Sequence, residues 1–195
     1  MSHRTDPLPP LSGLSHVIRE MRYHEASRQV LGLLFSVLCA VVAKPIPWAL
    51  YLTTVIVVIG VAVRMWASGF ILKNEQLATN GPYALVRHPL YTGNILVIYA
   101  FAGASGVWWT FVVATVFLLF YYPTAIEYED RKLSRIFGDV WQAFAKNTPA
   151  LVPAFGGRER DLGGHWSFKT SMTRNVEPVI AVFLFACFLF IYTRL

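Results

Sequence analysis

The stretch WALYLTTVIVVIGVAVRMW, residues 48–66, decides the class of fold. It is rich in valine and isoleucine and contains a single charged residue, Arg64. A helix of this length reaches about 30 Å, which is the thickness of the hydrocarbon core of a bilayer. We therefore expect residues 48–66 to form a membrane-spanning helix.

The composition of the whole chain agrees with this expectation. Of the 195 residues, 55% are hydrophobic and 14% are charged, whereas soluble domains average about 25% charged residues. The 14 phenylalanines, 9 tyrosines and 6 tryptophans suit lipid contact and anchoring at the membrane interface. Membrane lipid is thus the expected surrounding. The net charge of +6 does not predict nucleic-acid binding, because the basic residues form no stripe with interleaved aromatics.

The two cysteines and the N-terminus predict nothing beyond a membrane bundle. Cys39 and Cys187 lie in apolar runs without a CxxC partner, so neither a disulfide framework nor a metal site is expected. The first 20 residues contain no apolar stretch followed by a small-residue cleavage site. We therefore expect no removable signal peptide.

Four further apolar segments predict helices, at residues 29–43, 90–105, 107–122 and 178–192. The prolines of KPIP, residues 44–47, end the first of them, because proline inside a helix removes a hydrogen bond and clashes with the preceding turn. We therefore predict an all-α integral membrane protein with about five transmembrane helices, some of them short enough to require tilt or packed polar extensions. A re-entrant pair formed by residues 90–105 and 107–122 is the alternative.

Basic residues predict the orientation. Of the 17 lysines and arginines, only Lys44 and Arg194 fall on the side opposite to the N-terminal arm and the two long polar segments. Cytoplasmic segments carry an excess of such residues. We expect the N-terminus and both polar segments in the cytoplasm, and the C-terminus outside.

The first polar segment contains NGPYALVRHPLY, residues 80–91. Pro89 disfavours a helical conformation at His88 and suits the first position of a helix. We therefore expect a helix to begin at Pro89, with free N–H groups near residues 90–92 that could receive a carboxylate or phosphate. Arg87 and His88 lie beside that end.

The second polar segment contains IEYEDRKLSRIFGDVWQAF, residues 126–144. Its apolar residues recur at helical spacing, which predicts an amphipathic helix at the membrane surface, continuing from or bent off the preceding span. Glu127, Glu129 and Asp130 begin where the apolar run ends, where ionisable groups need partners or water. They could pair with nearby arginines and lysines, and the arginines could be interfacial anchors. Together with the Arg87–His88 pair, however, they favour a cytoplasmic polar pocket.

GPYALVRHPLY, followed about forty residues later by EDRKLSRIFGDVWQAF and then PALVP, resembles the isoprenylcysteine carboxyl methyltransferase and phospholipid methyltransferase superfamily. The resemblance covers residues 69–155. It divides the chain into a cytoplasmic arm (1–28), a transmembrane hairpin (29–66), a cofactor-binding core (67–155), and a linker with the C-terminal transmembrane helix (156–195).

The resemblance implies S-adenosylmethionine as cofactor, bound in a pocket formed by the two polar segments and the adjoining helix ends. By resemblance, the residues that contact it are Gln76, Leu77, Ala78, Tyr83, His88, Pro89, Leu90, Tyr91 and Glu129. The arginine that contacts substrate in the eukaryotic isoprenylcysteine enzymes stands four positions before the first acid, and here that position is Ala125. The cofactor half of the resemblance therefore carries over, while the prenylcysteine substrate does not.

Methyl transfer from a sulfonium needs alignment and exclusion of water more than acid–base chemistry. A carboxylate acceptor would need no base but would profit from a cation, for which Arg87, Arg131 and Arg135 are candidates. An amine acceptor could lose its proton to Glu127 or Glu129. We expect a lipophilic small-molecule or lipidated acceptor that enters from the bilayer. An NADPH-dependent membrane reductase of the sterol type and a non-catalytic membrane scaffold are the alternative functions.

Overall fold

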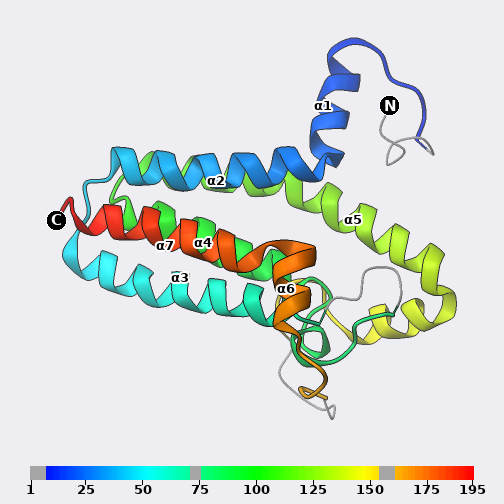
Figure 1. Ribbon diagram of the computed structural model, residues 1–195. Coiled ribbons are helices and arrows are strands. Elements are labelled where there is room, and N and C mark those ends of the chain that lie inside the picture. Colours follow the sequence, from blue (N-terminus) through cyan, green and yellow to red (C-terminus); the bar gives the residue numbers. More distant parts are fainter. Residues whose placement is uncertain (1–7, 71–75, 154–160) are drawn as a thin grey trace.

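The computed structural model describes residues 8–70, 76–153 and 161–195 and is helical throughout these residues, apart from loops (Figure 1). In chain order the helices are α1 (Gly13–Tyr23), α2 (Glu25–Val42), α3 (Pro47–Ser68), the 3-10 helix η1 (Gly81–Ala84), α4 (Pro89–Ala104), α5 (Trp108–Asn147), α6 (Phe168–Asn175) and α7 (Glu177–Tyr192). The predicted all-α fold is confirmed. The predicted boundary between residues 155 and 156 lies outside the described residues.

Five apolar helices, α2, α3, α4, α7 and the first half of α5, run side by side as a bundle (Figure 1). Three described helices, α2, α3 and α5, are long and apolar enough to cross a membrane. α4 and α7 have 16 residues each and reach about 24 Å, less than the roughly 30 Å of the hydrocarbon core. The tilt expected for short spans would shorten their reach further, so local thinning of the bilayer or polar extensions must make up the difference. Trp48, Leu119 and Val182 remain more than two-thirds exposed on the outside of the bundle, as expected of side chains that face lipid. The protein is an integral membrane protein.

The core of the bundle depends on a close approach of α3 and α4. A Cβ atom added at Gly60 would lie 2.9 Å from the carbonyl oxygen of Gly93, and one added at Gly93 would lie 2.7 Å from that of Gly60. Small residues at such crossings let two membrane helices pack backbone to backbone. Phe101 of α4 and Phe188 of α7, with ring centroids 5.4 Å apart, fill the neighbouring space.

Gly60→Ala is expected to destabilise the bundle more than Gly32→Ala by about 1–3 kcal/mol, the usual cost of overpacking. Both glycines lie inside helices, so both variants gain the same helix propensity. At Gly32 the nearest atom to an added Cβ is 4.0 Å away, at Phe117, and nothing has to move. Thermal unfolding in detergent, followed by circular dichroism, measures the difference. Equal melting temperatures would show that the crossing tolerates a methyl group.

The turn between α2 and α3 and the turn between α4 and α5 meet at one end of the bundle. The Lys44 N–H donates to the Ser105 carbonyl oxygen (2.7 Å), which joins the α2–α3 turn to the α4–α5 turn. Gly106 between α4 and α5 has φ +66°, and an added Cβ would collide with the Lys44 carbonyl group. Arg194 Nη1 donates to the Ala43 carbonyl oxygen (3.3 Å). We call this the turn end, and the opposite end, with η1 and α6, the loop end.

α5 spans 40 residues and consists of two helical segments that meet at a kink at Gly138; the first segment extends past the loop end of the bundle (Figure 1). The predicted span at 107–122 continues into the first part of the predicted amphipathic helix at 126–144 in spite of Pro123, whereas the kink interrupts that predicted helix at Gly138. At Gly138 the backbone leaves helical geometry (φ 51°, ψ −127°), a conformation that glycine adopts without strain. The chain turns there, so that its last helical residues return toward η1 and α4 (Figure 1).

The N-terminal arm differs from the prediction because residues 13–23 form α1. Leu14, Val17, Ile18 and Met21 recur at helical spacing and are exposed, a pattern too short to stand out among charged neighbours. α1 packs against α5, where Arg22 Nε donates to the Phe120 carbonyl oxygen (3.0 Å). α2 begins four residues earlier than predicted, at Glu25.

Candidate active site

A polar site lies at the loop end of the bundle, where α4 begins. Pro89 is the first residue of α4, as predicted, and His88 precedes it with an extended φ of −124°. The Arg87 N–H donates to the Pro149 carbonyl oxygen (2.8 Å) and the His88 N–H to that of Ala150 (3.0 Å). The chain that follows α5 therefore pairs with the residues that precede α4.

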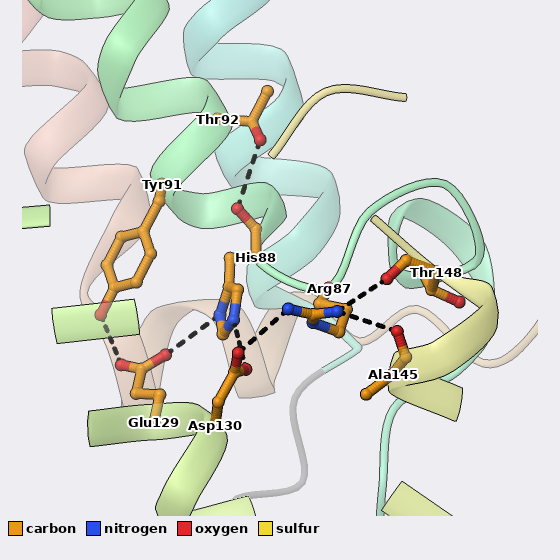
Figure 2. A network of polar contacts seen from close by, with 8 residues as sticks. All are labelled: Arg87, His88, Tyr91, Thr92, Glu129, Asp130, Ala145 and Thr148. Atoms are coloured by element: carbon orange, nitrogen blue, oxygen red, sulfur yellow. Dashed lines mark hydrogen bonds and ion pairs between the residues drawn. The ribbon is translucent and has the colours of Figure 1, made fainter. Parts of the chain in front are cut away.

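His88 is at the centre of this site (Figure 2). Its side chain is buried, with Nε2 2.8 Å from Asp130 Oδ1 and Nδ1 3.4 Å from Glu129 Oε2. The ring therefore bridges two consecutive carboxylates of α5. The Tyr91 hydroxyl donates to Glu129 Oε1 (2.6 Å), and the rings of His88 and Tyr91 stack with centroids 5.6 Å apart.

Glu129 is the open member of the network. Its side chain is 41% exposed, whereas that of His88 is 3% exposed. Tyr91 and His88 hold the Glu129 carboxylate from one side. Each carboxylate oxygen has one contact, Oε1 with Tyr91 and Oε2 with His88, and can accept a further hydrogen bond from a hydroxyl or ammonium group.

Arg87 fastens the end of α5 to this site (Figure 2). Its Nη2 donates to Asp130 Oδ2 (3.0 Å), and its Nη1 donates to the carbonyl oxygens of Ala145 (2.9 Å) and Thr148 (3.0 Å). The guanidinium also lies over the Trp141 ring, 5.9 Å from its centroid. These contacts direct Arg87 to protein groups and orient Asp130 toward His88.

The environment shifts the pKa of His88 upward. Burial by itself lowers the pKa of the imidazole, but hydrogen bonds to Asp130 and Glu129 and the charges of these carboxylates raise it above its usual value. Imidazolium between two carboxylates is the favoured state. In that state both ring nitrogens are donors, which matches the contacts on both sides of the ring.

A pH dependence of stability follows. A raised pKa in the folded state means that the ion pairs of His88 stabilise fully below the unfolded pKa of about 6.5. This stability is lost as the pH rises through the folded pKa. Between about pH 6.5 and the folded pKa, the melting temperature of the wild type should therefore fall more steeply than that of His88→Gln. Exposed His165→Gln is the control. Parallel curves for the wild type and His88→Gln in differential scanning fluorimetry would contradict the raised pKa.

The other residues expected at the cofactor pocket are placed around the network. Tyr83 and Pro89 are buried and Leu90 is half-buried. Gln76 is exposed, and Leu77 and Ala78 are half-buried, on the chain that leads into η1. None of these six residues belongs to the bonded network of Figure 2, which contains His88, Tyr91 and Glu129 of the expected set.

Two of the three catalytic candidates lie away from His88. Glu127 Oε1 is 3.7 Å from Arg131 Nη1, and both side chains are more than one-third exposed. Arg131 Nη2 also donates to the Tyr23 hydroxyl of α1 (3.2 Å). Glu127 and Arg131 thus form a surface pair that joins α5 to α1, whereas Arg87 lies in the network.

The expected free N–H groups at the start of α4 are largely absent. The N–H groups of Tyr91 and Thr92 both donate to the His88 carbonyl oxygen (3.0 and 3.1 Å), so this part of the prediction is wrong. His88 is the residue before the helix, and its carbonyl already accepts the first helical hydrogen bonds. Negative charge is instead supplied at this end by Glu129 and Asp130.

One residue at the site, Arg28 of α2, could not be predicted from the sequence. Its Cζ lies over the Tyr91 ring, 4.9 Å from the centroid. Arg28 stands at the start of an apolar run. The only sign that it could be buried is that α2 begins before it, at Glu25. Within the described residues, no group of three or more His, Cys, Asp or Glu side chains could hold a metal ion.

The residues present fit S-adenosylmethionine. The carboxylate of the partly exposed Glu129 suits its ribose hydroxyls or ammonium group, whereas Tyr83 and Tyr91 are buried and support the site from inside. The bundle and the network together define an integral membrane protein with a polar site at one end of its helices. The family model of the phospholipid methyltransferases matches residues 48–140, from α3 to just past the turn at Gly138. The match supports the resemblance of this region to the isoprenylcysteine carboxyl and phospholipid methyltransferase superfamily.

Curated relatives match a similar length of the chain. The chain is 41% identical over 93 residues to the cobalt-zinc-cadmium resistance protein CzcN of Cupriavidus metallidurans, covering 46% of this chain and 42% of the relative. It is 37% identical over 93 residues to the nickel-cobalt-cadmium resistance protein NccN of Alcaligenes xylosoxydans xylosoxydans (46% and 43%). It is 33% identical over 90 residues to methanethiol S-methyltransferase 2 of Bradyrhizobium diazoefficiens (46% and 33%). The match spans less than half the length of each relative. A search of solved structures found no significant match.

Proposed function

We propose that this protein is an S-adenosylmethionine-dependent membrane methyltransferase that acts on a lipophilic acceptor. The observation that carries the proposal is the single network in which His88, Tyr91 and Glu129 meet, because these residues lie about 40 positions apart in the two motifs and Glu129 keeps an open side. The family match and the relative named as a thiol methyltransferase support the type of reaction.

The residues of the site divide the work of such a reaction. S-adenosylmethionine supplies a methyl group on a sulfonium sulfur, which keeps the electron pair of the broken bond when a nucleophile attacks. Glu129 would bind the cofactor, and Tyr91 and His88 hold Glu129 in place. Arg87 and Asp130 in turn orient His88.

The acceptor is not the family's prenylcysteine carboxylate bound in the usual way. Ala125, at the position of the family's substrate arginine, is buried with 4% exposure among apolar residues of the core. It offers no charge to orient a carboxylate. A lipophilic carboxylate, or a small thiol of the kind named for the relative from Bradyrhizobium diazoefficiens, must be recognised by another group.

Calorimetric titration of the purified protein with S-adenosylmethionine tests the proposal. Saturable binding at one site per chain is expected, and excess NADPH should leave it unchanged. Absence of binding, or displacement by NADPH, would reject the proposal, the latter in favour of a reductase. Incubation of lipid extracts with methyl-labelled cofactor and mass spectrometry of the products would then name the acceptor.

We further infer that the loop end faces the cytoplasm, where the cofactor is made available. Lys44 and Arg194 both lie at the turn end, whereas Arg87, Arg131 and Arg135 lie at the loop end. Arg4, Lys73, Arg158 and Arg160 lie outside the described residues. A cysteine placed at position 44 should react with a membrane-impermeant maleimide from outside intact cells. Protection of this cysteine would reverse the orientation.

A further inference from the structure

A cavity of about 70 Å³ lies inside the bundle below the His88 network. It is well above the 10–15 Å³ or so that one water molecule requires. Residues of α2, α3, α4, α5 and α7 line it. Its polar part is formed by Arg28, Arg64 and Asn94, and its apolar part by residues deeper in the bundle, among them Leu33, Val97 and Phe117.

Arg64 is neutralised by its partners. Its Nε and Nη2 donate to the two carboxylate oxygens of Glu177 (3.0 and 2.6 Å), and its Nη1 donates to Asn94 Oδ1. The bidentate pair is buried, with side-chain exposures of 10% for Arg64 and 6% for Glu177. It forms one wall of the cavity and contributes no net charge.

Arg28 is the charged group in the cavity that has no hydrogen-bonded anion among the described residues. The residue is 8% exposed, and its guanidinium lies over the face of Tyr91, 4.9 Å from the ring centroid. Its charge also acts on the Glu129 carboxylate, but that carboxylate is bonded to Tyr91 and His88. Because the hydrogen-bond donors of a buried guanidinium need partners, Arg28 at the wall of a cavity is suited to receive an anion from outside the protein.

The position of Arg28 connects the cavity to the proposed active site. One face of the Tyr91 ring lies against Arg28, and the hydroxyl of the same ring donates to Glu129. An anion held by Arg28 would therefore lie next to the residues proposed to bind the cofactor. Behind it, the apolar wall could take a short hydrocarbon group.

We propose that this cavity binds the methyl acceptor, and that the acceptor is a small amphipathic organic anion, a carboxylate or thiolate held by Arg28 with its apolar part among Leu33, Val97 and Phe117. The assignment rests on the proposed function. It replaces the missing family arginine at position 125 with a cation from α2. A carboxylate acceptor is already anionic and needs no general base, whereas a thiol acceptor would first lose its proton to solvent, an ionisation that the positive charge of Arg28 favours.

Fluorine NMR with 4,4,4-trifluorobutanoate tests the assignment in the full chain in lipid nanodiscs, with 4,4,4-trifluorobutanol as the neutral probe of similar shape. The wild type should broaden the carboxylate signal saturably, and unlabelled butanoate and butanethiolate should each reverse the broadening. Arg28→Gln should weaken binding of the carboxylate probe at least tenfold, and Arg28→Lys should weaken it less. Arg22→Gln is the matched control, because Arg22 contacts Phe120 outside the cavity.

Gly32→Leu gives a second test that leaves Arg28 in place. An added Cβ at Gly32 meets only Phe117, at 4.0 Å, so a larger side chain there would fill the cavity and abolish binding of the probe. Equal binding of acid and alcohol, or unchanged binding in Arg28→Gln, would overturn the assignment.

Calorimetry with S-adenosylmethionine on the same samples separates the two proposals. Cofactor binding without probe binding would reject the acceptor site alone. Probe binding that depends on Arg28, without cofactor binding, would leave an anion site and reject the proposed function.

Discussion

Glu129→Gln is expected to weaken the binding of S-adenosylmethionine by about 2 kcal/mol or more, which is about 30-fold, the usual cost of removing a partly buried charged partner. The substitution keeps the shape of the side chain, but the amide presents one acceptor oxygen where the carboxylate presents two. It also leaves His88 without one of its two carboxylates. Methyl transfer should fall at least as far, and calorimetry with a labelled-methyl assay measures both.

Asp139→Asn is the matched control for this prediction. Asp139 is an exposed residue of the same helix, so the variant makes the same change of charge away from the network. Cofactor affinity should stay within about twofold of the wild type, because an exposed charge at that distance is screened by solvent and salt. If Glu129→Gln bound the cofactor as tightly as Asp139→Asn does, the cofactor would not contact Glu129.

The start of α4 could be predicted because it depends on local physics, whereas the sequence pattern left open whether residues 126–144 continue from the preceding span or bend off it. Proline at position 89 restricts His88 before it and fits the first turn after it, and the structure begins α4 at that residue. The apolar run of 107–122 and the amphipathic pattern of 126–144 share one helical period. A single proline at position 123 does not interrupt them.

The pairing of charges could not be predicted, because it depends on how distant segments meet. Asp130 has Arg131, Lys132 and Arg135 as sequence neighbours, yet its partners are Arg87 and His88. The reason is the turn at Gly138, which brings the end of α5 back toward Arg87. Arg87 then donates to carbonyl oxygens of that end. One glycine with positive φ therefore determines which carboxylate faces which cation.

The burial of two arginines in the bundle could likewise not be predicted from the sequence. Arg28 and Arg64 were counted as basic residues that orient the chain, and each is 8% exposed in the structure. Both occur within one or two turns of the loop end of their helices, where a charged side chain can reach inward as readily as toward the membrane surface. Only the packing of five helices decides between these directions.

Glu177→Ala should be the most destabilising single substitution among these residues, at about 3–5 kcal/mol, the usual cost of removing one partner from a buried ion pair. The carboxylate of Glu177 receives two hydrogen bonds from Arg64 at 3.0 and 2.6 Å. Without it, the Arg64 guanidinium stays in the bundle with Asn94 as its remaining partner among the described residues. Unfolding by sodium dodecyl sulfate, followed by circular dichroism in mixed micelles, measures the loss.

The double variant Arg64→Met with Glu177→Leu separates the unpaired charge from the lost contacts. Replacing both members of a buried pair by apolar side chains of similar size is often neutral or stabilising, so the double variant should recover most of the stability that Glu177→Ala loses. Arg28 is untouched in the double variant, and binding of trifluorobutanoate should persist if Arg28 alone holds the anion. A double variant as unstable as the single one would mean that Arg64 and Glu177 are needed for their shape and hydrogen bonds, and that the unpaired charge is not the cause.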